Sequence, residues 1–163
     1  TYGREFAVRH VDCLFTSIRD ASLMKANLDS IRAMGEGRKF GLFASGHVIC
    51  RPTRKEAEEF YHYIVHEHGD WEAAESAAVI RLKGREGRYD DIQNFKERLI
   101  SGLGTYMLFG SYDEVAEHIK RLSDATLDGM ALGMVNYISE IEHLRDGLFP
   151  RLERMGLREK KLS

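Results

Sequence analysis

A glycine and an arginine near the start of the chain have the chemistry to bind an anion. The stretch Tyr2-Gly3-Arg4-Glu5 stands before Phe6–His10, which the sequence predicts as a helix, with Gly3-Arg4-Glu5 ending a tight loop. Free amides at a helix start, a glycine that lets a ligand approach the backbone, and a neighbouring guanidinium together suit phosphate. The alternative is a turn that carries an exposed cation and binds nothing.

A second glycine stands before another predicted helix. Gly110 and Ser111 suit a loop that joins a strand to a helix, and such loops bind ligands in barrel enzymes. A glycine turn followed by a helix cap explains the same residues without a ligand, and we adopt that interpretation.

The histidines do not predict a metal site. His62 and His66 lie one helical turn apart, but Tyr63 follows His62, so the zinc motif HExxH is absent. Histidines near the C-terminus of a helix are favoured by its dipole, which explains the pair without a metal. His47 lies in an apolar run and is predicted to be a core or barrel-mouth histidine with satisfied hydrogen bonds rather than a catalytic base. No catalytic residue is assigned.

The elements that position these residues alternate between strand and helix. Three nearly continuous apolar runs, at 11–16, 40–50 and 128–135, predict strands of a parallel sheet. Each is followed by a predicted helix, which makes the fold class α/β. Residues 69–104 interrupt this order and are predicted as an insertion of two helices.

Several helix starts carry a capping box, in which a hydroxyl and a glutamate three residues later satisfy free amides. The sequence predicts three such boxes, which begin at Thr53, Ser111 and Ser139. The last of these helices contains Pro150, which is expected to kink or break it because proline has no amide hydrogen to donate.

Composition excludes several classes of function. The 163 residues carry 24 basic and 26 acidic side chains, a net charge of −2 with the signs well mixed, so a nucleic-acid partner is not expected. No apolar run approaches the roughly 18 residues of a membrane span, so a membrane partner is not expected either. Cys13 and Cys50 lie in apolar runs and are predicted to be buried free thiols, which fits a reducing compartment, the cytoplasm by default.

Four segments in this order resemble the C-terminal half of a luciferase-like, flavin-dependent monooxygenase. They are the helix start that leads into a strand (GREFAVRHVDCLFT), the glycine and cap before a helix (FGSYDEVA), the Asp-Gly pair at the start of a strand, and the closing segment (FPRL, then GLR). The resemblance covers nearly the whole chain. It implies a (β/α)8 barrel, of which residues 1–163 form the last three βα units as part of one domain, with 69–104 as a helical insertion.

The resemblance also implies a cofactor and partners. In this family reduced flavin mononucleotide (FMN), supplied by a flavin reductase, and molecular oxygen oxygenate a small organic substrate. Gly3 and Arg4 match the loop that binds the flavin phosphate, with Tyr2 as a further candidate, whereas the family's catalytic residues belong to the other half. Oxidoreductases of the same fold that use the deazaflavin F420, and a non-catalytic half-barrel that acts as an assembly module, are the alternatives.

Three strands taken from a barrel have two unpaired edges. Their inner faces, with side chains such as Leu14, Leu42, Ile49 and Leu132, are expected to lose the opposing wall of the barrel. The sequence therefore predicts that the chain pairs with a second copy, as a homo-oligomer, or with the rest of its barrel.

Overall fold

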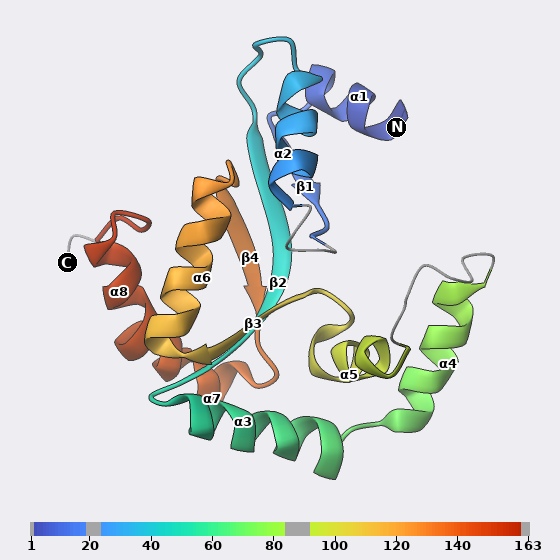
Figure 1. Ribbon diagram of the computed structural model, residues 1–163, viewed down its shortest axis with the longest axis vertical. Coiled ribbons are helices and arrows are strands. Elements are labelled where there is room, and N and C mark those ends of the chain that lie inside the picture. The colour runs from blue at the N-terminus through green and yellow to red at the C-terminus, as the bar shows by residue number, and fades with distance from the viewer. Residues whose placement is uncertain (1, 19–23, 84–91, 161–163) are drawn as a thin grey trace.

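A parallel sheet forms the centre of the molecule. The computed structural model describes residues 2–18, 24–83 and 92–160. Its sheet has four strands, β1 (Cys13–Thr16), β2 (Gly41–Arg51), β3 (Tyr106–Ser111) and β4 (Gly129–Gly133), and every strand pairing is parallel (Figure 1). The predicted α/β class and the parallel arrangement of the strands are confirmed.

Strand β2 pairs with all three other strands. Phe43 is in register with Phe15 of β1 and with Gly129 of β4, so β1 and β4 lie on opposite edges of β2. Strand β3 pairs with the later part of β2. Gly46 of β2 is in register with both β3 and β4, so these two strands lie on opposite edges of β2. Strand β3 therefore shares an edge with β1, which pairs with the earlier part of β2. The three predicted strands thus form one continuous set in the order β1-β2-β4, although β4 is shorter than the expected 128–135.

Strand β3 is the strand that the apolar runs do not reveal. It ends at Gly110 and Ser111, whose turn and cap signals obscure the short run before them. It pairs with the end of β2, and Leu108 is completely buried in the main hydrophobic core. Tertiary contact rather than local pattern therefore makes this segment a strand.

Helices and two π-helical stretches connect the strands. Their bounds are α1 (Tyr2–His10), α2 (Met24–Ala33), α3 (Arg54–His62), η1 (Tyr63–Glu67), α4 (Trp71–Leu82), α5 (Ile92–Gly102), α6 (Tyr112–Asp124), α7 (Tyr137–Glu142), η2 (His143–Leu148) and α8 (Phe149–Arg154). The two helices α4 and α5 occupy the predicted insertion and pack against each other (Figure 1). No helix in these described ranges is long and apolar enough to cross a membrane.

Two of the three predicted capping boxes are confirmed, before α3 at Thr53 and before α6 at Ser111. The box predicted at Ser139 is wrong, because α7 begins earlier. Asn136 is its N-cap and accepts from the Ile138 amide at 3.0 Å, while the Glu140 carboxylate accepts from the Asn136 amide at 2.9 Å. An asparagine caps as well as a serine does, so the start moves upstream.

The helical run that contains Pro150 changes type before the proline. The π-helical stretch η2 ends at Leu148, and α8 begins at Phe149 with Pro150 in its first turn. A proline is tolerated there because the first amides of a helix have no intrahelical acceptor. The interruption therefore lies where the missing donor costs least.

One face of the sheet is covered by helices. Leu14, Leu42 and Leu132 belong to the main hydrophobic core, together with side chains of α2, α6 and α8. Ile49 points to the other face of β2, where residues of α3 and η1 bury it completely in a second cluster. The expectation that these four side chains line an uncovered inner face is therefore wrong.

The opposite face of the sheet is open over β1, β4 and the part of β2 that precedes His47. Side chains alternate along a strand, so the neighbours of the covered residues point the other way. Phe15 on β1 is 57% exposed and stacks on Phe43 of β2, with ring centroids 5.5 Å apart. Ser45 on β2 and Ala131 on β4 are exposed on this same face. We call Phe15, Phe43, Ser45 and Ala131 the open face.

The two cysteines differ in their surroundings. Cys13 was predicted to be buried, but it is exposed because it precedes Phe15 by two residues and shares its face. Cys50 is buried as predicted, and burial raises the pKa of its thiol to about 12.

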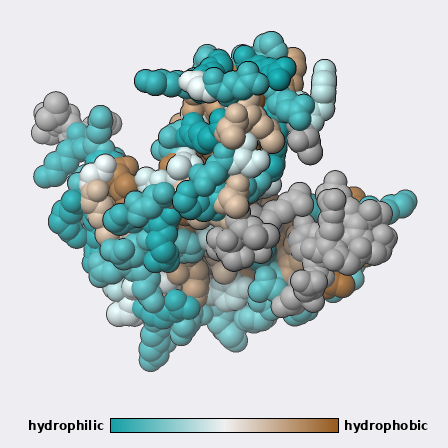
Figure 2. Space-filling model, turned by 45° about the horizontal axis from the view of Figure 1, so that its top comes forward, coloured by the Kyte–Doolittle hydropathy of each residue, from teal (hydrophilic) through white to brown (hydrophobic). Residues whose placement is uncertain are grey.

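Figure 2 shows hydrophilic residues over most of one side of the molecule, with smaller apolar areas between them.

Candidate functional site

The residues predicted to bind phosphate lie in the first turn of α1. The helix begins at Tyr2, so the prediction that Gly3-Arg4-Glu5 forms a loop before it is wrong. The amides of this turn have no intrahelical acceptors and face away from the helix body. Gly3 is open, since a Cβ atom there would meet nothing within 4 Å, and Tyr2 is 83% exposed.

Arg4 is held toward the next helix. Its Nη1 donates to Oδ1 of Asn27 on α2 at 2.8 Å, and the side chain is half-buried. Among the residues that the structure describes, no second acceptor holds this guanidinium, so its other N–H groups are available to an anion. Free amides, an open glycine and a positioned arginine are a donor set that fits a phosphate group.

A cavity of about 530 Å³ lies between the sheet and the turn that follows α5. The sheet contributes Ser45, Gly46 and His47 from β2 and the end of β4. The other walls are the turn at 100–105 and the segment 134–137 after β4. None of the predicted phosphate ligands Tyr2, Gly3 and Arg4 lines this cavity.

His47 joins the sheet to the turn after α5. Its Nδ1 lies 3.0 Å from the Thr105 hydroxyl, and its Nε2 lies 3.2 Å from the Ser101 hydroxyl. The Thr105 hydroxyl donates its one hydrogen to the Gly102 carbonyl, so it accepts from His47 Nδ1–H. Nε2 then accepts from Ser101.

This arrangement keeps His47 neutral. The side chain is 3% exposed, and burial lowers its pKa to about 4, with the nearby Arg98 guanidinium adding to the shift. Both ring nitrogens already have partners, which leaves none for a substrate proton. The prediction of a satisfied core histidine therefore fits, and His47 acts by positioning the turn.

The turn after α5 requires unusual backbone conformations. A Cβ atom on Gly102 would lie 2.1 Å from the His47 ring, so only glycine fits. Leu103 and Gly104 both have positive φ, of 56° and 77°. Arg81 donates to the Leu103 carbonyl at 2.8 Å and Arg98 to the Gly104 carbonyl at 3.3 Å. Sequence reasoning missed this turn, although two glycines that flank one leucine were a signal for it.

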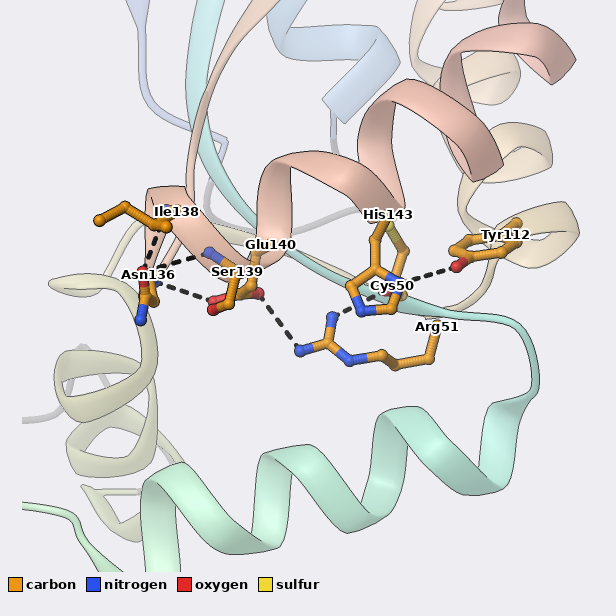
Figure 3. Close-up of polar contacts among 8 residues, drawn as sticks. All are labelled: Cys50, Arg51, Tyr112, Asn136, Ile138, Ser139, Glu140 and His143. Carbon is orange, nitrogen blue, oxygen red and sulfur yellow. Dashed lines mark hydrogen bonds and ion pairs between the residues drawn. The ribbon is translucent and has the colours of Figure 1, made fainter.

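A buried ion pair holds the segment after β4. The Arg51 guanidinium lies 3.5 Å from the Glu140 carboxylate, donates to the Cys50 carbonyl at 2.8 Å and stacks 3.8 Å from the centre of the Phe60 ring. Glu140 also accepts from the amide of Asn136 (Figure 3). Because Asn136 lies within segment 134–137, these contacts fix one wall of the cavity.

A family model described as luciferase-like monooxygenase matches residues 2–129 of this chain. The chain belongs to that family. The match covers the helix start at Gly3, the strands β1, β2 and β3, and the glycine that opens β4, in agreement with the resemblance seen in the sequence.

Solved structures of other proteins share the fold of this luciferase-like chain. Riboflavin lyase (RcaE), in a crystal structure with modified FMN and the substrate riboflavin, has a TM-score of 0.79 at 21% identity. DmoA from Hyphomicrobium sulfonivorans has a TM-score of 0.81 at 16% identity. These matches cover 99% and 100% of this chain but only 42% and 41% of the other two. This chain thus spans less than half the length of these two structures and matches that part of their fold.

A third structure of related fold uses a different cofactor. The coenzyme F420-dependent tetrahydromethanopterin reductase from Methanopyrus kandleri has a TM-score of 0.54 at 14% identity, over 90% of this chain and 47% of its own. The fold of the luciferase-like chain is thus shared by proteins that differ in cofactor.

The remaining candidates of the luciferase-like chain lie away from the cavity. His62 and His66 have ring centroids 5.2 Å apart, and His62 pairs with the Glu67 carboxylate at 3.1 Å. Within residues 2–18, 24–83 and 92–160, no three His, Cys, Asp or Glu side chains converge as metal ligands would. Gly110 and Ser111 serve the cap of α6 and do not line the cavity.

Proposed function

We propose that this chain forms part of a flavin-dependent monooxygenase. The enzyme uses reduced FMN from a flavin reductase, together with molecular oxygen, to oxygenate a small organic substrate. The observation that carries the proposal is the family match over 2–129, and the cavity between the parallel sheet and the α5 turn supports it. Barrel enzymes bind their substrates at the carboxyl ends of the strands, and the cavity includes the end of β4.

The residues of this chain act at two sites, the first turn of α1 and the walls of the cavity. Gly3 and Arg4, with Tyr2 beside them, hold the phosphate group through first-turn amides and a guanidinium. His47 holds the turn that forms one cavity wall, and Glu140 holds another. Reduced FMN, when bound, supplies the electrons for oxygen chemistry, and the protein supplies binding, orientation and exclusion of water.

A deazaflavin-dependent oxidoreductase is the second candidate. The F420-dependent reductase of related fold favours it, because the same barrel accepts a different isoalloxazine-like ring. The phosphate-binding residues do not distinguish the two cofactors, since both carry a phosphate.

The test is an anaerobic titration of the protein that carries this chain, with reduced FMN and with reduced F420 in parallel. The proposal expects saturable binding of reduced FMN, followed by substrate-dependent oxygen uptake when oxygen is admitted. Binding of reduced F420 alone, with no oxygen uptake, would replace it by the second candidate. Binding of neither cofactor would refute both.

A further inference from the structure

A second cavity adjoins the first. It measures about 470 Å³ and lies among η1, α4 and α5. Its apolar lining comes mainly from small or aliphatic side chains: Ile64, Ala73, Ala74, Ala77 and Leu99. Ile100, Leu103 and Val135 line both cavities, so these three residues form the partition between them.

The partition has a fixed backbone and a free side chain. The Leu103 carbonyl accepts from Arg81, and the peptide after Gly104 is tied to His47 through Thr105. The Leu103 side chain itself is 75% exposed, and its φ of 56° is costly for any residue with a Cβ atom. The place of this side chain is therefore set by the turn, while its size sets how much of the partition it fills.

The second cavity offers apolar contact more than polar contact. Its charged residues already have partners, since Asp70 accepts from the Ala73 amide at 2.8 Å and Arg81 donates to the Leu103 carbonyl. The alanines on α4 leave room that larger side chains would fill. A ligand group without hydrogen-bonding atoms fits such a site best, because burial of unpaired polar atoms is costly.

We propose that the second cavity binds the apolar tail of the substrate and that Leu103 determines how long a tail is accepted. The role as a substrate site rests on the proposed function, whereas the binding of an apolar chain does not. The reacting end of the substrate lies in the first cavity, and the tail passes Leu103 toward α4.

The experiment measures binding of straight-chain 1-alkanols, from hexanol to tetradecanol, by calorimetry without flavin. In the unmodified protein each added methylene is expected to raise the affinity about fourfold, the equivalent of ~0.8 kcal/mol, until the second cavity is full. Leu103→Phe narrows the passage and should end this rise at a short alcohol. Ala77→Phe partly fills the second cavity and should end the rise in affinity at an alcohol of intermediate length.

Ile80→Phe is the matched control, because Ile80 is also 75% exposed and lines neither cavity. It should leave the length dependence unchanged. If Ala77→Phe unfolds the protein, Ala73→Phe fills the second cavity instead, from a position that is exposed. The same limiting length in every variant, or no gain in affinity with length in the unmodified protein, would overturn the proposal.

The two proposals fail separately. Length-dependent alcohol binding without any binding of reduced flavin keeps the apolar site and refutes the monooxygenase. Flavin binding with oxygen uptake but no length dependence refutes the tail site alone.

Discussion

The guanidinium of Arg51 and the carboxylate of Glu140 lie 3.5 Å apart, although 89 residues separate them in the chain. Their side chains are 10% and 4% exposed. The pair joins the end of β2 to α7, the helix that follows β4.

Glu140→Leu is expected to lower the free energy of unfolding by about 3 kcal/mol, because Arg51 then remains as a buried and unpaired charge. Arg51→Met combined with Glu140→Leu should lower the free energy of unfolding by less than Glu140→Leu alone. Urea unfolding measures both. Asp29→Ala, which breaks an exposed pair with Lys25, is the control and should cost less than about 0.5 kcal/mol. A double variant as unstable as Glu140→Leu would contradict this reading.

Gly102→Ala should destabilise the protein by about 1–3 kcal/mol, because the new methyl group meets the His47 ring at 2.1 Å. Gly3→Ala is the matched change in open space, and it should be neutral or stabilising by up to about 1 kcal/mol, since alanine favours a helix. Thermal unfolding compares the two. Equal effects of the two alanines would show that the contact with His47 does not constrain the turn.

His47 should make the protein less stable in acid. Its pKa is lowered to about 4 from an ordinary 6.5, so between these values the unfolded chain binds a proton that the folded chain does not. Stability is thus complete above pH 6.5 and falls as the pH drops toward 4, by about 3 kcal/mol in total.

Urea unfolding at pH 7 and at pH 4.5, for the unmodified protein and for His47→Gln, checks this. Glutamine retains hydrogen-bonding groups without titrating, so the variant should lose less stability between the two conditions. The pKa values of His118 and His143 are also lowered by burial and contribute with the same sign, but equally in both proteins. Identical pH dependence in the two proteins would rule out His47 as the source.

Arg4→Ala should weaken flavin binding by about 1.5–3 kcal/mol in the protein that carries this chain, the usual range for a hydrogen bond to a charged group. Arg9→Ala is the control, because Arg9 is exposed at the other end of α1. Fluorescence titration with FMN measures both. An unchanged dissociation constant for Arg4→Ala would remove Arg4 from the phosphate site.

The 163-residue chain should self-associate at micromolar concentration. Among the described strands, β1 and β4 pair only with β2, and the open face exposes Phe15. Unpaired strand edges and uncovered apolar surface favour association. Sedimentation should therefore detect dimers or larger species, and Phe15→Ser should reduce them. A folded monomer at this concentration is the contrary result.

Local sequence determined those features whose partners lie within a few residues. The caps at Thr53 and Ser111 each use a glutamate three positions on, so each capping box is complete within four residues. The alternation of apolar runs with helical stripes likewise determined the α/β class. Where two local signals competed, as at Asn136 and Ser139, the sequence alone did not decide between them.

Only the tertiary structure decided which side of each strand is covered. The period of two predicts that Leu14 and Phe15 point in opposite directions, but it does not say which of them meets a helix. Leu14 packs against the main core, which includes residues of α2 and α6, whereas Phe15 and Cys13 are left exposed. His47 likewise depends on hydroxyls 54 and 58 residues away. Such contacts arise from packing between distant segments, which a pattern within one segment does not encode.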